Sequence, residues 1–105
     1  MQEHQSEQEL HDQLNAGTGK IEWTELERHF ARGVVVKVDP ALDLVEVAAC
    51  MVRDDTESLR TWMSDGSVAK ATEDDARAWG ERQPLFWAVV TAPWVLIQEI
   101  EHPDN

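Results

Sequence analysis

Three carboxylates near the middle of the chain have the types and spacing of a divalent-cation site. Asp39, Asp43 and Glu46 lie four and three residues apart, so a helix would bring them to one side. Carboxylate oxygens are the ligands that Mg²⁺ and Ca²⁺ prefer, and paired carboxylates can also perform acid and base chemistry. Capping gives a simpler interpretation, because Asp39 precedes Pro40 and acids in a first helical turn favour the helix dipole. We expect capping. A small-molecule or divalent-metal binding protein, or a metal-assisted enzyme using these three residues, is the alternative hypothesis.

Nucleophilic chemistry has less support in the sequence. A catalytic Ser, Cys or Thr needs a nearby histidine, and only His29 lies within an element expected to fold. Cys50 is flanked by Ala48, Ala49 and Met51, which is typical of a buried, unreactive thiol. The chain contains none of the glycine-rich phosphate-binding motifs and no His-Glu-x-x-His. We therefore expect no catalytic residue and no cofactor, and the sequence favours a protein that is not an enzyme.

Tryptophan is the unusual residue type in this chain, with five tryptophans and no tyrosine. Trp94 directly follows Pro93, which cannot donate to a β-ladder, so its strand is expected at a sheet edge. Edge strands accept partner strands, and tryptophan is a common interface residue. Trp94 and Trp87 are therefore predicted to contact a protein partner or a second copy, unless all five tryptophans fill the core.

Composition excludes several classes of function. A formal charge of -12 disfavours contact with nucleic acid or an anionic membrane surface. One cysteine permits no internal disulfide, which fits a reducing compartment. The N-terminal residues have neither a basic leader nor an apolar stretch. These features predict an acidic, Trp-rich, cytoplasmic protein.

The hydrophobic pattern predicts one α+β domain over residues 21–100, with a sheet of about three strands and about four helices. Residues 1–20 are expected to be a flexible acidic tail and linker, and 101–105 a disordered C-terminus. Leu10 and Leu14 allow a short helix in that tail, but two leucines alone would not hold it in place. In chain order, the elements expected are a helix at 24–32, a central strand at 34–38, a helix from Asp39 to about 53, a helix from 55 or 56 to Gly66, a short strand at 67–70, a helix from Thr72 to before Pro84, and two extended segments within 85–100.

Three segments resemble a family of small bacterial proteins, domain of unknown function family 2288. They are TELERHFARGVVVKVDPALDLVEVAACMVRDD, WMSDGSVAKAT and FWAVVTAPWVLIQEI, and the resemblance covers about residues 23–100. It implies a small, uncharacterised bacterial protein of one domain. It implies no activity, cofactor or site residue, so the function predicted from the residues is a non-catalytic protein-interaction or regulatory module.

Overall fold

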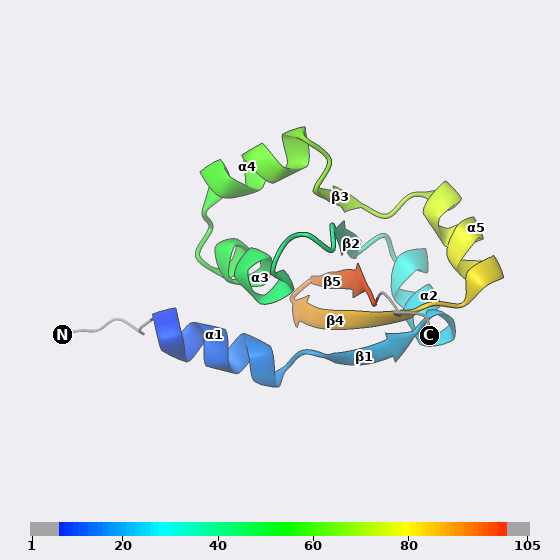
Figure 1. Cartoon of the computed structure of the whole chain (residues 1–105), viewed down its shortest axis with the longest axis horizontal. Coiled ribbons are helices and arrows are strands. Elements are labelled where there is room, and N and C mark those ends of the chain that lie inside the picture. The colour runs from blue at the N-terminus through cyan, green and yellow to red at the C-terminus, as the bar shows by residue number, and fades with distance from the viewer. Residues whose placement is uncertain (1–6, 101–105) are drawn as a thin grey trace.

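The structure is a computed structural model that describes residues 7–100. Five helices and five strands follow one another along these residues (Figure 1). They are α1 (Glu7–Ala16), β1 (Gly19–Glu22), α2 (Trp23–Ala31), β2 (Val35–Val38), α3 (Leu44–Val52), α4 (Thr56–Ser64), β3 (Val68–Lys70), α5 (Glu73–Arg82), β4 (Leu85–Thr91) and β5 (Trp94–Glu99). The α+β class predicted from the sequence is confirmed, and so is the order of the elements from α2 to β5.

The five strands form one sheet in the order β1-β4-β5-β2-β3. Neighbouring strands are antiparallel except β2 and β5, which are parallel, with Val36 opposite Leu96. The apolar run of β2 predicted an internal strand, and β2 does lie between β5 and β3 with three of its four residues buried.

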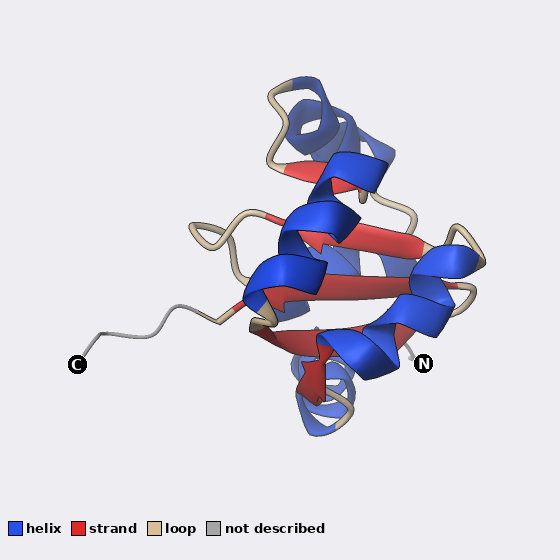
Figure 2. Ribbon diagram, turned by 90° about the vertical axis from the view of Figure 1, so that its right-hand side faces the viewer, coloured by secondary structure: helices blue, strands red, loops and turns tan. Residues whose placement is uncertain are grey.

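Helices cover both faces of the sheet, so the protein has three layers. Figure 2 shows α2 and α5 in front of the strands, where they enclose the core that includes Leu26, Trp79 and Phe86. On the other face, α1 and α3 enclose a second core around Val47, Val89 and Leu96. Side chains of β4 and β5 alternate between the two cores, as the two-residue period of a strand requires.

Several helix boundaries follow the capping signals. Thr72 and Asp75 form a reciprocal capping box at the start of α5, and the Asp55 side chain accepts from the Ser58 amide at the start of α4. The helix expected from Asp39 instead begins at Leu44 and is capped by Asp43, which accepts from the amides of Val45 and Glu46. The Asp39 carboxylate accepts from the Ala41 amide and closes a turn, so the earlier N-cap assignment was wrong.

The flexible tail expected at residues 1–20 is absent over the described part of that segment. Residues 7–16 are helical, and 19–22 pair with β4 at the edge of the sheet. Leu14 is 9% exposed and belongs to the core between the sheet and helices α1 and α3, which we call the α3-side core. Leu10 packs against the same core. The hydrogen bonds between β1 and β4 fix the C-terminal end of α1 next to the sheet. They add to the packing of Leu10 and Leu14, which alone would not hold α1 in place. The sheet thereby has five strands and not three; residues 1–6 and the C-terminus expected to be disordered, 101–105, lie outside the described residues.

The prediction that Trp94 lies on an edge strand was also wrong. β5 is the middle strand of five, paired with β4 on one side and β2 on the other. Pro93 lies in the two-residue turn between β4 and β5, where no ladder hydrogen bond is needed from it. Strand addition at β5 is therefore blocked by its own neighbours.

Candidate functional site

The three carboxylates of the metal hypothesis do not converge on one point. The Asp39 side chain is used in its turn and the Asp43 side chain caps α3. Glu46 pairs with His11 of α1, with 2.8 Å between Oε1 and Nε2. Among residues 7–100, no group of three or more His, Cys, Asp or Glu side chains is arranged to hold a metal ion. The structure thus gives Asp39 a role in a turn, Asp43 a role in capping α3 and Glu46 a role in docking α1.

Cys50 lies next to this pair but is a poor nucleophile. Its side chain is buried in α3, with Sγ 3.9 Å from Glu46 Oε2 and 3.8 Å from Asp55 Oδ2. Burial raises the pKa of the thiol, and Glu46 and Asp55 raise it further, which outweighs the lowering effect of Arg53. A thiol that stays protonated in this way does not attack electrophiles readily.

The two tryptophans predicted to contact a partner lie on the same face of the sheet but in separate surroundings. Trp87 is 38% exposed, and Lys20 lies over its ring at 5.3 Å. Trp94 is half-buried, and Lys70 lies 5.8 Å from its ring. Thr91, the partner of Trp94 across the turn, is four residues along β4 from Trp87, or about 13 Å. The two rings therefore belong to different parts of the surface.

Trp94 lines an open groove of about 450 Å³ between the end of α3, the start of α4 and the β4–β5 turn. We call it the Trp94 groove, and it is lined by Met51, Val52, Asp54, Leu59, Thr91, Ala92 and Trp94. Val52 is 52% exposed at its rim. Met63 lies one turn beyond Leu59 on α4 and is 59% exposed, so it extends the apolar surface away from the groove.

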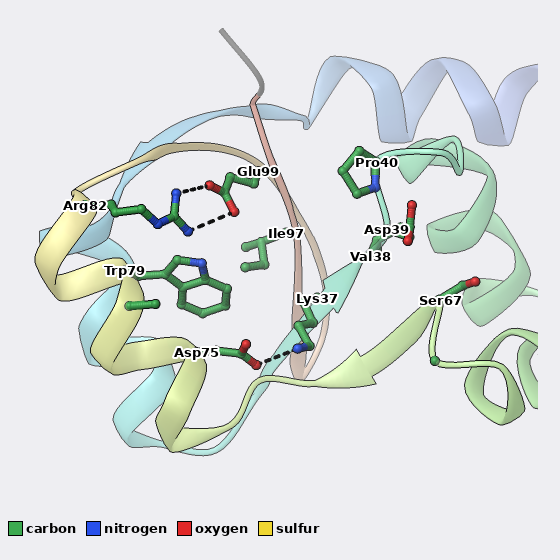
Figure 3. Close-up of a pocket in the computed structure, with 12 residues that line it drawn as sticks. Lys37, Val38, Asp39, Pro40, Ser67, Asp75, Trp79, Arg82, Ile97 and Glu99 are labelled. Carbon is green, nitrogen blue, oxygen red and sulfur yellow. Dashed lines mark hydrogen bonds and ion pairs between the residues drawn. The ribbon is translucent and has the colours of Figure 1, made fainter.

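A second hollow lies between α5 and the carboxyl ends of β2 and β5 (Figure 3). This charged pocket has a volume of about 300 Å³. Two ion pairs cross it: Lys37 Nζ is 2.7 Å from Asp75 Oδ2, and Arg82 donates to both oxygens of Glu99 at 2.6 and 3.4 Å. Figure 3 shows the Trp79 indole and the Ile97 side chain between the two pairs. Residues from three separate elements thus place two cations and two carboxylates around one apolar floor.

The ion pairs stabilise the ionised forms of Asp75 and Arg82. Partial burial opposes ionisation of Asp75, but hydrogen bonds from Lys37 and Thr72 outweigh it, so the pKa of Asp75 is below its usual value. Hydrogen bonding to Glu99 raises the pKa of Arg82. Asp75 and Arg82 are therefore both charged at neutral pH.

The loss of stability caused by substituting Asp75 should depend on pH, because the Asp75 side chain stabilises the fold only when it is ionised. Because its pKa is lower in the folded protein than in the unfolded chain, ionised Asp75 stabilises the fold above about pH 4. That contribution is lost as the pH falls through the folded-state pKa. We expect Asp75→Asn to lower the free energy of unfolding by about 1 kcal/mol at pH 7 and by progressively less towards pH 2, as measured by urea unfolding at each pH.

Asp74→Asn is the matched control, because Asp74 precedes Asp75 but is 88% exposed in its pair with Arg77. It should cost less than about 0.5 kcal/mol. A loss for Asp75→Asn that is the same at pH 7 and pH 2.5 would contradict the role given to the Asp75 charge.

The chain matches the model of a family described as a protein of unknown function, DUF2288, over residues 9–99. The chain belongs to this family. The match begins inside α1, so the DUF2288 region includes the segment that the sequence alone suggested was a tail. It also contains every residue that lines the Trp94 groove and the charged pocket.

A solved structure of similar fold is the NMR solution structure of PA1075 from Pseudomonas aeruginosa. The two chains are 45% identical, with a TM-score of 0.79, and the comparison covers 99% of this chain and 98% of PA1075. The search of curated proteins gave no match. Neither the family description nor the solved structure names an activity. In addition, no helix within residues 7–100 is both long and apolar enough to cross a lipid bilayer.

Sequence reasoning missed the charged pocket of this DUF2288 protein. Of the candidate site residues predicted from the sequence (Asp39, Asp43, Glu46, Trp87 and Trp94), only Asp39 lines it. One signal was available: Asp75, Trp79 and Arg82 are spaced for one helical face, which places two charges beside an aromatic ring. That Lys37 and Glu99 would meet this face follows only from the parallel pairing of β2 and β5.

Proposed function

We propose that the protein is a non-catalytic interaction module of the bacterial cytoplasm that binds a basic segment of a partner protein in the Trp94 groove. The observation that carries this proposal is the groove itself, a concave surface that combines apolar side chains, among them a half-buried tryptophan and an exposed valine, with the polar Asp54 and Thr91. Partly buried tryptophans in such pockets contribute much of the binding energy at interfaces.

The exposed apolar side chains of α3 and α4 support this location. Val52 and Met63 each expose more than half of their surface, and Leu59, one turn before Met63 on α4, lines the groove with Val52. Isolated apolar residues on a surface are ordinary, but several of them at and near one tryptophan groove are typical of an interaction site. A partner side chain of leucine size would remove both Val52 and Trp94 from water.

Charge favours a basic partner over a second copy. Two copies of a chain with a net charge of -12 repel each other, which disfavours self-association through this surface. Asp54 lines the groove itself. The segment from Arg53 to Asp65 contains two basic residues (Arg53 and Arg60) and four acidic ones (Asp54, Asp55, Glu57 and Asp65). Even with Lys70, which lies 5.8 Å from the Trp94 ring, acidic residues outnumber basic ones here. A segment that combines an apolar side chain with lysine or arginine would complement both features.

Val52→Asp should weaken partner binding, while Val90→Asp should not. Both valines are exposed, at 52% and 62%, but only Val52 lines the groove. The full-length protein and both variants are used for capture from lysate of the source bacterium. A carbodiimide reagent then cross-links carboxylates to the amines of the partner, and the products are identified by mass spectrometry.

We expect one protein to be retained by the wild type and Val90→Asp and reduced at least about tenfold on Val52→Asp, a change of roughly 1.4 kcal/mol. Its cross-links should join Asp54 or Glu57 to a lysine in a basic segment. Equal retention by both variants, equal loss from both, or recovery of the protein alone would contradict the proposal.

A further inference from the structure

Strand β1 forms one outer edge of the sheet, away from the proposed docking groove. Within the sheet that the structure describes, β1 pairs with β4 on one side only, and none of its residues lines the Trp94 groove. Figure 1 shows β1 along the lower border of the molecule, with α1 before it and α2 after it. The unpaired backbone groups of an edge strand are a template for a further strand. The free edge of β1 is therefore a second candidate interaction surface.

The pairing of β1 with β4 determines which backbone groups face this edge. Leu85 lies opposite Glu22, and its carbonyl accepts from the Ile100 amide on the β5 side. In an antiparallel pair, opposite residues either exchange hydrogen bonds or both point away from each other. The backbone of Glu22 therefore points away from β4, and so does that of Lys20, because the direction alternates along a strand. The amides of both residues and the Lys20 carbonyl face the open edge.

The side chains of the same two residues carry opposite charges. Lys20 and Glu22 are both exposed, and the contact of Lys20 with the Trp87 ring places them on the α1 and α3 side of the sheet. Neither has an ion-pair partner among residues 7–100. Ile21 lies between them and points to the other face, where it packs against the core beneath α2 and α5. The edge thus presents one positive and one negative charge on either side of an apolar residue.

Symmetry limits the register in which a second copy could pair with this edge. An antiparallel dimer has its two-fold axis perpendicular to the sheet, so each residue must lie opposite a residue of the same face. Pairing about Lys20 or about Glu22 would place like charges opposite each other, which is destabilising. Pairing about Ile21 places Lys20 of each copy opposite Glu22 of the other. The Glu22 amide of each copy can then donate to the Lys20 carbonyl of the other.

The flanking helices and the net charge set how strong such a pairing can be. Helices α1 and α2 pack in separate cores, so they leave the two ends of β1 towards opposite faces of the sheet. In the dimer, α1 of one copy and α2 of the other lie at the same end of the paired strands but on different faces. The net charge of -12 per copy opposes association, although charges more than about 8 Å apart are largely screened at physiological salt. A short pairing against this repulsion predicts a weak dimer.

We propose that the protein forms a weak symmetric dimer in which the β1 strands of two copies pair antiparallel about Ile21, with Lys20 of each copy bound to Glu22 of the other. The two sheets join into one continuous sheet. The Trp87 ring positions Lys20 at the edge, so this exposed tryptophan acts in the interface through its contact with Lys20.

Sedimentation equilibrium of the purified full-length protein tests the proposal at pH 7 and about 0.15 M salt. Over concentrations from about 10 µM to about 1 mM, we expect a dimer with a dissociation constant on the order of 0.1 mM. Glu22→Lys should weaken it at least about tenfold, because like charges then lie opposite each other. The double variant Lys20→Glu/Glu22→Lys exchanges the two charges and should restore the dissociation constant to within about threefold of the wild-type value.

Glu57→Lys is the matched control, because it makes the same change in net charge on α4, which packs beside β3 at the other edge of the sheet. Both single variants reduce the general repulsion between copies, so Glu57→Lys should dimerise at least as tightly as the wild type. The Glu22 side chain makes no capping hydrogen bond to α2, and thermal melts establish that every variant is folded. Equal dissociation constants for Glu22→Lys and Glu57→Lys, or no recovery in the double variant, would overturn the proposal. A monomer at every concentration would also overturn it and would leave the β1 edge to a strand of another protein.

Discussion

Phe86→Ala is expected to lower the free energy of unfolding by about 3–5 kcal/mol, a large part of the stability of a domain of this size. The Phe86 side chain is fully buried on the α2 and α5 side of the sheet. Its ring meets Trp79 edge-on at 5.1 Å, and Trp79 in turn packs against Trp23 at 5.7 Å. Truncation leaves a cavity beneath two helices and removes an aromatic contact. Urea unfolding followed by tryptophan fluorescence measures the loss.

Trp87→Ala provides the matched control, because Trp87 is the next residue of β4 and points to the opposite face. Its ring is 38% exposed and contacts Lys20, so its removal should cost about 1 kcal/mol or less. A one-residue shift in the register of β4 would exchange the two faces and reverse the order of these losses. A larger loss for Trp87→Ala would therefore contradict the sheet register.

Elements with strong local signals could be predicted from the sequence. The Thr72–Asp75 capping box and the apolar run of β2 each appear where expected. Gly33 and Gly66 follow α2 and α4 with positive φ angles of 75° and 85°, the conformation that favours glycine after a helix. These signals are carried by a few adjacent residues and do not depend on the rest of the fold.

Elements that depend on distant partners could not be predicted in the same way. β1 has only Ile21 as an apolar residue, and it forms because β4 supplies its hydrogen bonds. Pro93 correctly indicated an interruption, but the sequence could not show that the interruption was a turn at the end of the middle strand. The pocket pairs Lys37–Asp75 and Arg82–Glu99 join residues 38 and 17 positions apart, so their geometry is set by the tertiary structure.

Helix α1 is the element for which sequence and structure differ most, and Leu14 tests whether it belongs to the core. Leu14 is packed among Val47, Val89 and other residues of the α3-side core, and Leu10 lies beside it. His11 adds a contact to Glu46 at 2.8 Å. We expect Leu14→Ala to lower the free energy of unfolding by about 2–3 kcal/mol while unfolding remains a single transition.

Gln13→Ala should have almost no effect, since Gln13 is an exposed neighbour in the same helix and alanine is a good helix former. The comparison is made by urea unfolding, with circular dichroism and tryptophan fluorescence recorded on the same samples. Coincident curves for Leu14→Ala would mean that α1 melts with the sheet, as expected of a helix that covers part of the core. If Leu14→Ala instead matched Gln13→Ala in stability, α1 would be a weakly attached segment and the core could not depend on it.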